Sequence, residues 1–177
     1  LGPPGVGKTS LLRTLDTETT LFLDFEAGDL AVADVEVDTL RPSTWQECRH
    51  IACLLAGANA NAKPDETYGQ QHYDAVVSKY GSGLNLDKYD TFFIDSITEA
   101  GRMCFQWCEQ QPEAFNSKGV KDTRSVYGLH GREMVKWIKH LQQARDRNVV
   151  FVCLLEEKED EFGRKEWAPQ IEGSKTG

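Results

Sequence analysis

The residues best suited to chemistry stand at the start of the chain, in the stretch Gly2-Pro3-Pro4-Gly5-Val6-Gly7-Lys8-Thr9. This stretch fits the pattern G-x-x-x-x-G-K-[ST], in which glycines let the backbone curl so that its N–H groups point at phosphate oxygens. The Lys8 ammonium would meet the β- and γ-phosphates, and the Thr9 hydroxyl would bind Mg²⁺. Chance produces this pattern in roughly one chain of this length in a few hundred. We therefore predict a nucleotide site made of Gly2, Pro3, Pro4, Gly5, Val6, Gly7, Lys8, Thr9 and Ser10.

An acidic residue at the end of a later apolar run is the second candidate for this site. The run Tyr89-Asp90-Thr91-Phe92-Phe93-Ile94-Asp95-Ser96 has the pattern of a buried parallel strand that ends in a carboxylate. In P-loop nucleotide hydrolases, such a carboxylate helps to hold Mg²⁺, and we expect Asp95 to do so through water. The carboxyl ends of parallel strands meet at one edge of a sheet, so Asp95 should lie beside the glycine-rich stretch.

The apolar pattern also predicts the elements that would position these groups. We expect strands at 20–26, 35–37, 89–96 and 149–155, and helices at 8–15, 43–56, 97–110 and 128–145. Ser43 and Gln46 form a capping box for the second of these helices. Residues 65–80 present one apolar helix face closed by Gly81-Ser82-Gly83, and 156–177 alternates as a hairpin with Trp167 on its return strand. The expected fold class is α/β, a mostly parallel sheet flanked by helices on both faces and followed by a C-terminal β-hairpin.

The two ends of the sequence indicate a piece of a longer protein. Only Leu1 precedes the glycine-rich stretch, which normally follows a buried strand, and 173–177 contains no closing element. We therefore expect 1–177 to be a single domain truncated at both ends, with the first strand of the sheet missing.

Composition excludes some classes of protein. The 177 residues are 40% hydrophobic, and no run reaches the roughly 18 apolar residues of a membrane span. Five cysteines without framework spacing favour buried free thiols in a reduced, cytoplasmic protein, and the four histidines have no metal spacing. The net charge of −8 argues against a general electrostatic grip on nucleic acid, but leaves room for a local basic loop.

Several stretches resemble known P-loop ATPases. Leu23-Asp24-Phe25-Glu26 and Phe93-Ile94-Asp95-Ser96 resemble the corresponding strands of RecA-type recombinase ATPases. The chain as a whole is more similar to phage-associated RecA-like AAA family ATP-binding proteins. The stretches that carry this similarity best are 89–98, 127–134 and 169–177.

The resemblance implies a RecA-like fold, ATP and Mg²⁺ as ligands, and roles for particular residues. Glu26 matches the glutamate that polarises the attacking water, and Lys8 is the other catalytic group. The alternative for Glu26 is a turn residue. Asp24 is expected to be structural and Ser96 an auxiliary to Asp95. One departure is Leu155, which stands where RecA-type enzymes place a polar sensor of the γ-phosphate and which cannot hydrogen-bond to phosphate.

The resemblance also implies partners. RecA-type proteins place a DNA-contacting loop after the helix that follows the Asp95 strand. Here that stretch, 112–124, carries Lys118, Lys121 and Arg124, with Phe115 available to stack on a base of single-stranded DNA. The alternative is a solvated loop whose charges offset acidic neighbours. A homo-oligomer with nucleotide sites at its interfaces is a further expectation.

Mg²⁺-dependent ATP binding and hydrolysis is the function that fits these residues, in the service of phage DNA recombination, single-strand annealing or replication. The expected location is the cytoplasm, that of the bacterial host if the protein is phage-encoded. Two alternatives stay open. A P-loop kinase for small molecules would need an arginine-bearing lid and an acceptor pocket, and a nucleotide-gated binding module with little turnover would be consistent with Leu155.

Overall fold

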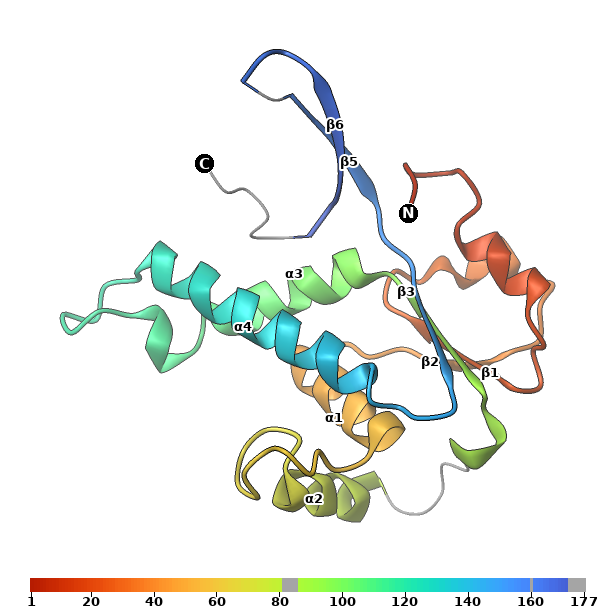
Figure 1. Cartoon of the computed structure of the whole chain (residues 1–177), viewed down its shortest axis with the longest axis horizontal. Helices are drawn as coiled ribbons and strands as arrows, with labels where there is room; N and C mark the ends of the chain where they lie inside the picture. Colours follow the sequence, from red (N-terminus) through yellow and green to blue (C-terminus); the bar gives the residue numbers. More distant parts are fainter. Residues whose placement is uncertain (81–85, 160, 172–177) are drawn as a thin grey trace.

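The computed structural model describes residues 1–80, 86–159 and 161–171, with the side chain of Asp29 left out. The expected helix closure at 81–83 and residues 172–177 of the last resemblance stretch lie outside the described residues. Within the described part, the chain forms a parallel sheet, helices packed against it, and a separate hairpin (Figure 1).

The sheet has four parallel strands in the order β2-β1-β3-β4. The strands are β1 (Thr20–Asp24), β2 (Asp38–Leu40), β3 (Thr91–Asp95) and β4 (Asn148–Phe151). Every residue of β1 and β3 is buried, as expected for central strands covered on both faces. Asp24 and Asp95 are partners in the register of β1 and β3, so the two strands end side by side. The predicted α/β class with a mostly parallel sheet is confirmed.

Three long helices cover one face of the sheet: α1 (Trp45–Ala56), α3 (Ile97–Cys108) and α4 (Thr123–Leu141). Side chains alternate along a strand, and Leu21 and Leu23 of β1 point into this larger core. Trp45 of α1 and Trp137 of α4 fill its centre, with ring centroids 5.6 Å apart and only 1% of each residue exposed.

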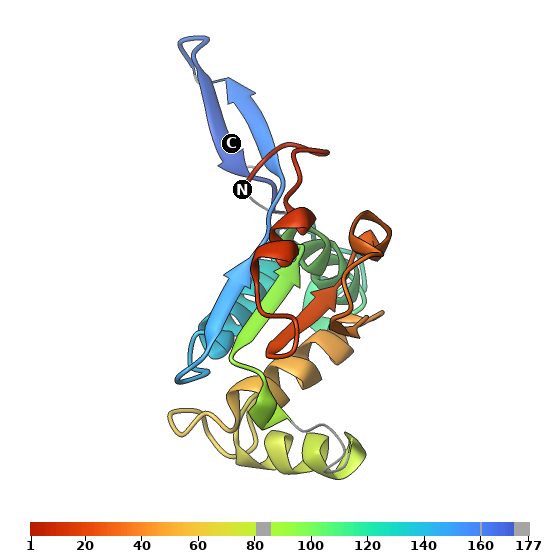
Figure 2. The same cartoon turned by 90° about the vertical axis from the view of Figure 1, so that its right-hand side faces the viewer.

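The opposite face is covered differently from the prediction. Phe22 and Phe93 pack there with Leu12, Val32 and Val152, and the covering elements are two 3₁₀ helices, η1 (Thr9–Thr14) and η2 (Gly28–Val32). Figure 2 shows the red N-terminal turns on this side of the sheet and the long helices behind it. The expected α-helix at 8–15 is therefore a 3₁₀ helix, and in the described residues no α-helix covers this face.

Two boundaries near β2 also differ from the prediction. The edge strand is 38–40 and not 35–37, because its pairing with β1 begins at Asp38, while Val35 and Val37 pack on the smaller core. The α1 cap lies one residue later than expected, since the Thr44 side chain accepts a hydrogen bond from the backbone of Glu47, whose carboxylate accepts from the Ser43 backbone.

A second helical layer packs on α1, away from the sheet. Its helix, α2 (Gln70–Tyr80), confirms the helix expected in 65–80. Short 3₁₀ turns, η4 (Leu86–Lys88) and η5 (Pro112–Ala114), join the larger elements.

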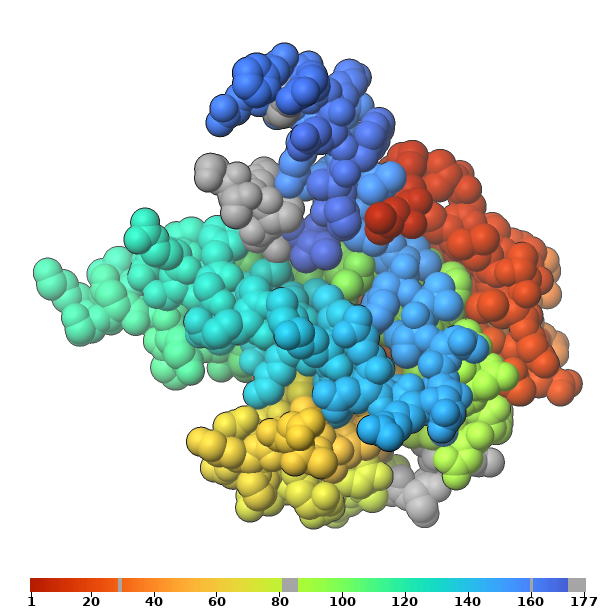
Figure 3. Space-filling model, viewed as in Figure 1, coloured from red at the N-terminus to blue at the C-terminus, as the bar shows by residue number. Residues whose placement is uncertain are grey.

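The hairpin formed by β5 (Leu155–Glu159) and β6 (Lys165–Pro169) confirms the predicted C-terminal hairpin. It projects from the body, and 59% of Trp167 on its return strand is exposed (Figures 1 and 3). The strand expected at 149–155 does not stay in the sheet to Leu155, since β4 ends at Phe151 and Leu155 is the first residue of β5. The expectation that Leu155 ends this strand is wrong.

All five cysteines are buried free thiols, as predicted. Among the described helices, none has the length and apolar character needed to cross a membrane.

Candidate nucleotide site

The glycine-rich stretch forms an open loop before η1. Gly5 and Gly7 adopt φ values of 76° and 83°, a left-handed region that glycine enters without the strain of a side chain. Among the described residues, the N–H groups of Gly5, Val6 and Gly7 donate to no protein acceptor. A run of unused N–H donors in a curled loop is the arrangement that binds an anion.

The start of this loop is tied to the end of the sheet. The Gly2 N–H donates to the Cys153 carbonyl at 3.3 Å, and the Leu155 N–H donates to the Gly2 carbonyl at 3.2 Å. Gly2 is therefore anchored beside the segment that follows β4, and the loop emerges at the carboxyl edge of the parallel strands. Ligands of open α/β sheets bind at this edge.

Lys8 and Thr9 occupy the end of the loop, where η1 begins. The Lys8 Nζ donates to the Pro3 carbonyl at 2.9 Å, so the ammonium lies folded over the loop that it would share with a phosphate. The Thr9 hydroxyl donates to Oδ2 of Asp95 at 2.5 Å. The structure thus brings together the two residues that were predicted as metal ligands, from positions 86 residues apart.

Asp95 is a buried carboxylate, with 4% of the residue exposed. Burial raises the pKa of its carboxyl above the ordinary value; the hydrogen bond from Thr9 opposes that shift, and the negative charge of Glu26 adds to it. A cation placed beside Asp95 would favour the charged carboxylate.

Asp24 adds an acid that sequence reasoning treated only as structural. Its carboxylate, on a residue only 2% exposed, accepts from the Gly28 N–H at 2.9 Å and pairs with Arg41 at 3.3 Å. A Cβ at Gly28 would lie 3.7 Å from Thr9 Oγ1 and 3.9 Å from Asp24 Oδ1, so Asp24 also borders the Thr9–Asp95 pair. The signal that could have revealed this is that both acids close their strands.

Glu26 lies on the turn after β1 and contacts Ser96, the residue that follows β3. The Phe25 N–H donates to the Asp95 carbonyl at 2.8 Å, which extends the pairing of the strands and fixes the start of the turn. Ala27 then takes the left-handed conformation, with φ of 52°. The Glu26 side chain is on an exposed residue, and one of its oxygens accepts a hydrogen bond from the Ser96 hydroxyl.

The donor set fits Mg²⁺ better than a metal caged by protein. No cluster of three or more His, Cys, Asp or Glu suited to a metal occurs in the described part of the chain. Mg²⁺ in nucleotide sites commonly keeps several waters and is held by one or two protein oxygens together with phosphates. The hydroxyl of Thr9 and the carboxylate of Asp95 are oxygen donors of that kind.

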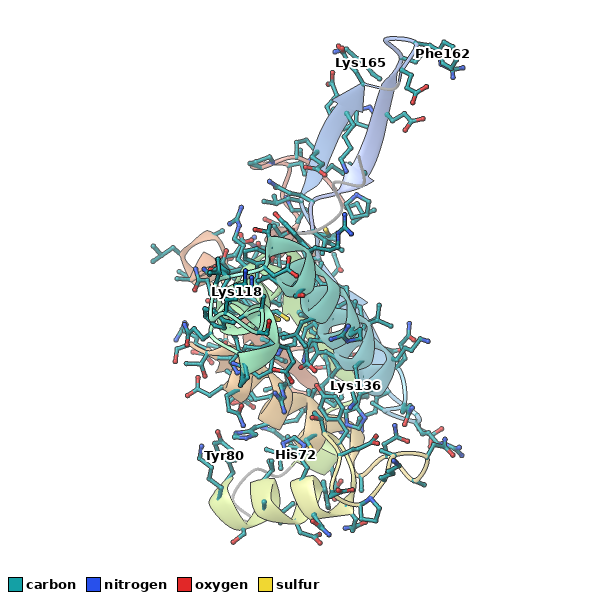
Figure 4. The ribbon with its side chains drawn as sticks, turned by 90° about the vertical axis from the view of Figure 1, so that its left-hand side faces the viewer. His72, Tyr80, Lys118, Lys136, Phe162 and Lys165 are labelled. Carbon is teal, nitrogen blue, oxygen red and sulfur yellow. The ribbon has the colours of Figure 1, made fainter. Side chains whose placement is uncertain are left out.

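The predicted DNA loop lies apart from this site. Helix α3 carries the chain away from the carboxyl edge, and the loop follows at the far end of the helix (Figure 1). Lys118 is exposed, whereas Lys121 pairs with Glu109 at 2.8 Å. Helix α4 begins at Thr123 and not at Gly128, because Asp122 caps it, so Arg124 belongs to the first turn of that helix. Figure 4 shows Lys118 well separated from Phe162 and Lys165 at the hairpin tip.

Comparison with protein families gives a match that covers the chain. A protein-family model described as an AAA domain matches residues 1–177. Searches of curated proteins and of solved structures each found no significant match.

Proposed function

The chain belongs to the AAA domain family, a group of nucleotide-binding P-loop NTPases, and from that premise we propose that it binds Mg²⁺–ATP and hydrolyses it to ADP and phosphate. The observation that carries this proposal is the contact between Thr9 and Asp95, 2.5 Å apart, beside a loop with unused N–H donors. This contact supports a site that has both a phosphate cradle and a place for a divalent cation.

In the proposed site, the loop residues bind the phosphates. The N–H groups of Gly5, Val6 and Gly7 would donate to phosphate oxygens, and Lys8 would exchange the Pro3 carbonyl for a phosphate oxygen. Thr9 would hold Mg²⁺ through its hydroxyl and Asp95 through water. The bound ion would neutralise negative charge on the β- and γ-phosphate oxygens.

Glu26 is the proposed water-activating residue. It lies at the carboxyl edge of the sheet, on the turn after β1, and its carboxylate contributes to the charge felt by Asp95. A carboxylate at this position can accept a proton from a water that attacks the γ-phosphorus. Asp24 is less suited to that task because Gly28 and Arg41 already occupy its two oxygens.

Nucleotide binding can be tested by calorimetric titration of ATP with Mg²⁺ into the protein and into the Lys8→Ala variant. Charge-assisted hydrogen bonds contribute roughly 1.5–3 kcal/mol each, so the variant should bind at least about tenfold more weakly. Lys139→Ala, a change at an exposed lysine near the end of α4, is the control and should bind as the parent does. Equal affinity in the Lys8→Ala variant and the parent would refute the site.

We further propose that the ATPase is RecA-like and acts on single-stranded DNA in phage recombination, annealing or replication. The supporting feature is the 112–124 stretch, where exposed Lys118 and Arg124 accompany Phe115, which is 41% exposed. Cations bind the backbone of single strands and aromatic rings stack on bases. The Lys121–Glu109 pair limits the charge that the loop can offer.

A further inference from the structure

Ser96 lies between Glu26 and the first turn of α3. The Ser96 hydroxyl donates to Oε1 of Glu26. Oγ of Ser96 also accepts a hydrogen bond from the Glu99 N–H at 3.3 Å and so caps α3. Ser96 is fully buried, with 0% of the residue exposed. In this arrangement the Ser96 hydroxyl is therefore shielded from solvent.

The direction of these hydrogen bonds follows from chemistry. The Glu99 N–H can only donate, and an ionised Glu26 carboxylate can only accept. The single hydroxyl proton of Ser96 must then go to Glu26, while a lone pair faces Glu99. This fixed arrangement holds one oxygen of a carboxylate that otherwise stands on an exposed turn.

We propose that Ser96 is a positioning residue that sets Glu26 for water activation, an inference that rests on the proposed hydrolysis. Oε1 is held by Ser96, and in the described part of the chain no other hydrogen bond to the Glu26 carboxylate occurs. Oε2 is thus free to accept from a water. Because rigid placement of a catalytic group governs the rate of the chemical step, Ser96 should affect turnover and not ATP affinity.

The test separates positioning from helix capping with a matched variant. Thr44 caps α1 in the same way, with its side chain accepting from the Glu47 N–H at 3.2 Å, but it does not contact Glu26. Ser96→Ala and Thr44→Ala should lower the unfolding midpoint to a similar extent. Only Ser96→Ala should reduce kcat, by about tenfold, with ATP affinity unchanged. Ser96→Gly keeps most of the capping preference and lacks the hydroxyl, so it should lose turnover without the same loss of stability.

A double-mutant cycle shows whether Ser96 acts through Glu26. Adding Ser96→Ala to Glu26→Gln should reduce turnover no further, because the residue that Ser96 positions has already lost its function. Parent-like kcat in Ser96→Ala and Ser96→Gly, faster turnover in either, or additive losses in the double variant would overturn the inference. Parent-like turnover in Glu26→Gln alone would instead refute the proposed role of Glu26, so the two failures are distinguishable.

Discussion

A buried histidine at the end of α4, His140, makes the stability of the fold sensitive to acid. His140 is 1% exposed, and its ring stacks on Tyr68 with centroids 4.0 Å apart and planes inclined by 12°. Within the described residues, neither ring nitrogen makes a hydrogen bond of good geometry, and a weak contact with the backbone of Gly57 only partly opposes the effect of burial on the pKa of His140. Burial, with a smaller contribution from the charge of His72, lowers the pKa of His140 from 6.5 to about 4.

The sign of the effect follows from proton binding. Below pH 6.5 the unfolded chain protonates His140, whereas the folded chain does so only near pH 4, so acid favours unfolding. The contribution is complete above pH 6.5 and is lost as pH falls toward 4. Linkage gives a loss of about 2 kcal/mol between pH 7.5 and pH 5, and about 3 kcal/mol in full.

The substitution His140→Phe tests this reasoning. Phenylalanine keeps a ring against Tyr68 and cannot be protonated, so the loss of unfolding free energy between pH 7.5 and pH 5 should be about 2 kcal/mol smaller than in the parent. Urea unfolding at the two pH values measures this difference, and any packing cost of the larger ring is common to both. The parent and the variant share a further acid sensitivity from His50 and His72, because burial also lowers the pKa values of these two residues. The same pH dependence in variant and parent would refute the account.

Two further predictions concern the basic loop at 112–124 and a pair of glycines outside the nucleotide site, Gly69 and Gly131. If the 112–124 stretch binds single-stranded DNA, the logarithm of the affinity should fall with the logarithm of the salt concentration, by about 0.7 per neutralised phosphate. Replacing Lys118, Lys121 and Arg124 with alanine should flatten that slope by about two, while ATP binding persists. DNA binding that is unchanged in this variant would exclude the loop. A Cβ at Gly69 would collide with backbone carbonyls of the preceding turn, whereas one at Gly131 in α4 meets nothing within 4 Å. Gly69→Ala should therefore lower the unfolding free energy by more than about 2 kcal/mol, and Gly131→Ala should raise it by up to about 1 kcal/mol. Similar unfolding free energies for the two variants would contradict this packing.

The features that were predictable from sequence are those written in local patterns. The glycine-rich stretch is contiguous, and the run that ends at Asp95 is apolar throughout, so its strand could be located and its carboxylate placed at the correct edge. The hairpin was also visible, because its alternation and its turn are local.

The features that escaped prediction depend on contacts between distant residues. The edge strand begins at Asp38, where its pairing with β1 starts, and the carboxylate of Asp38 accepts hydrogen bonds from Lys88 and Tyr89, which are distant in sequence. The pairing of Asp24 with Arg41 and the bond from Ser96 to Glu26 arise from strand register. A single sequence carries no direct sign of such pairs.

The measurement that tests the central claim most directly is phosphate release from ATP, in the presence of Mg²⁺, by the protein and by its Glu26→Gln variant, with ATP affinity measured in parallel. The parent should turn over ATP, and the variant should bind ATP equally well but release phosphate about a hundredfold more slowly. Equal rates would return Glu26 to the role of a turn residue. ATP binding without turnover by the parent would contradict hydrolysis and favour a nucleotide-gated binding module.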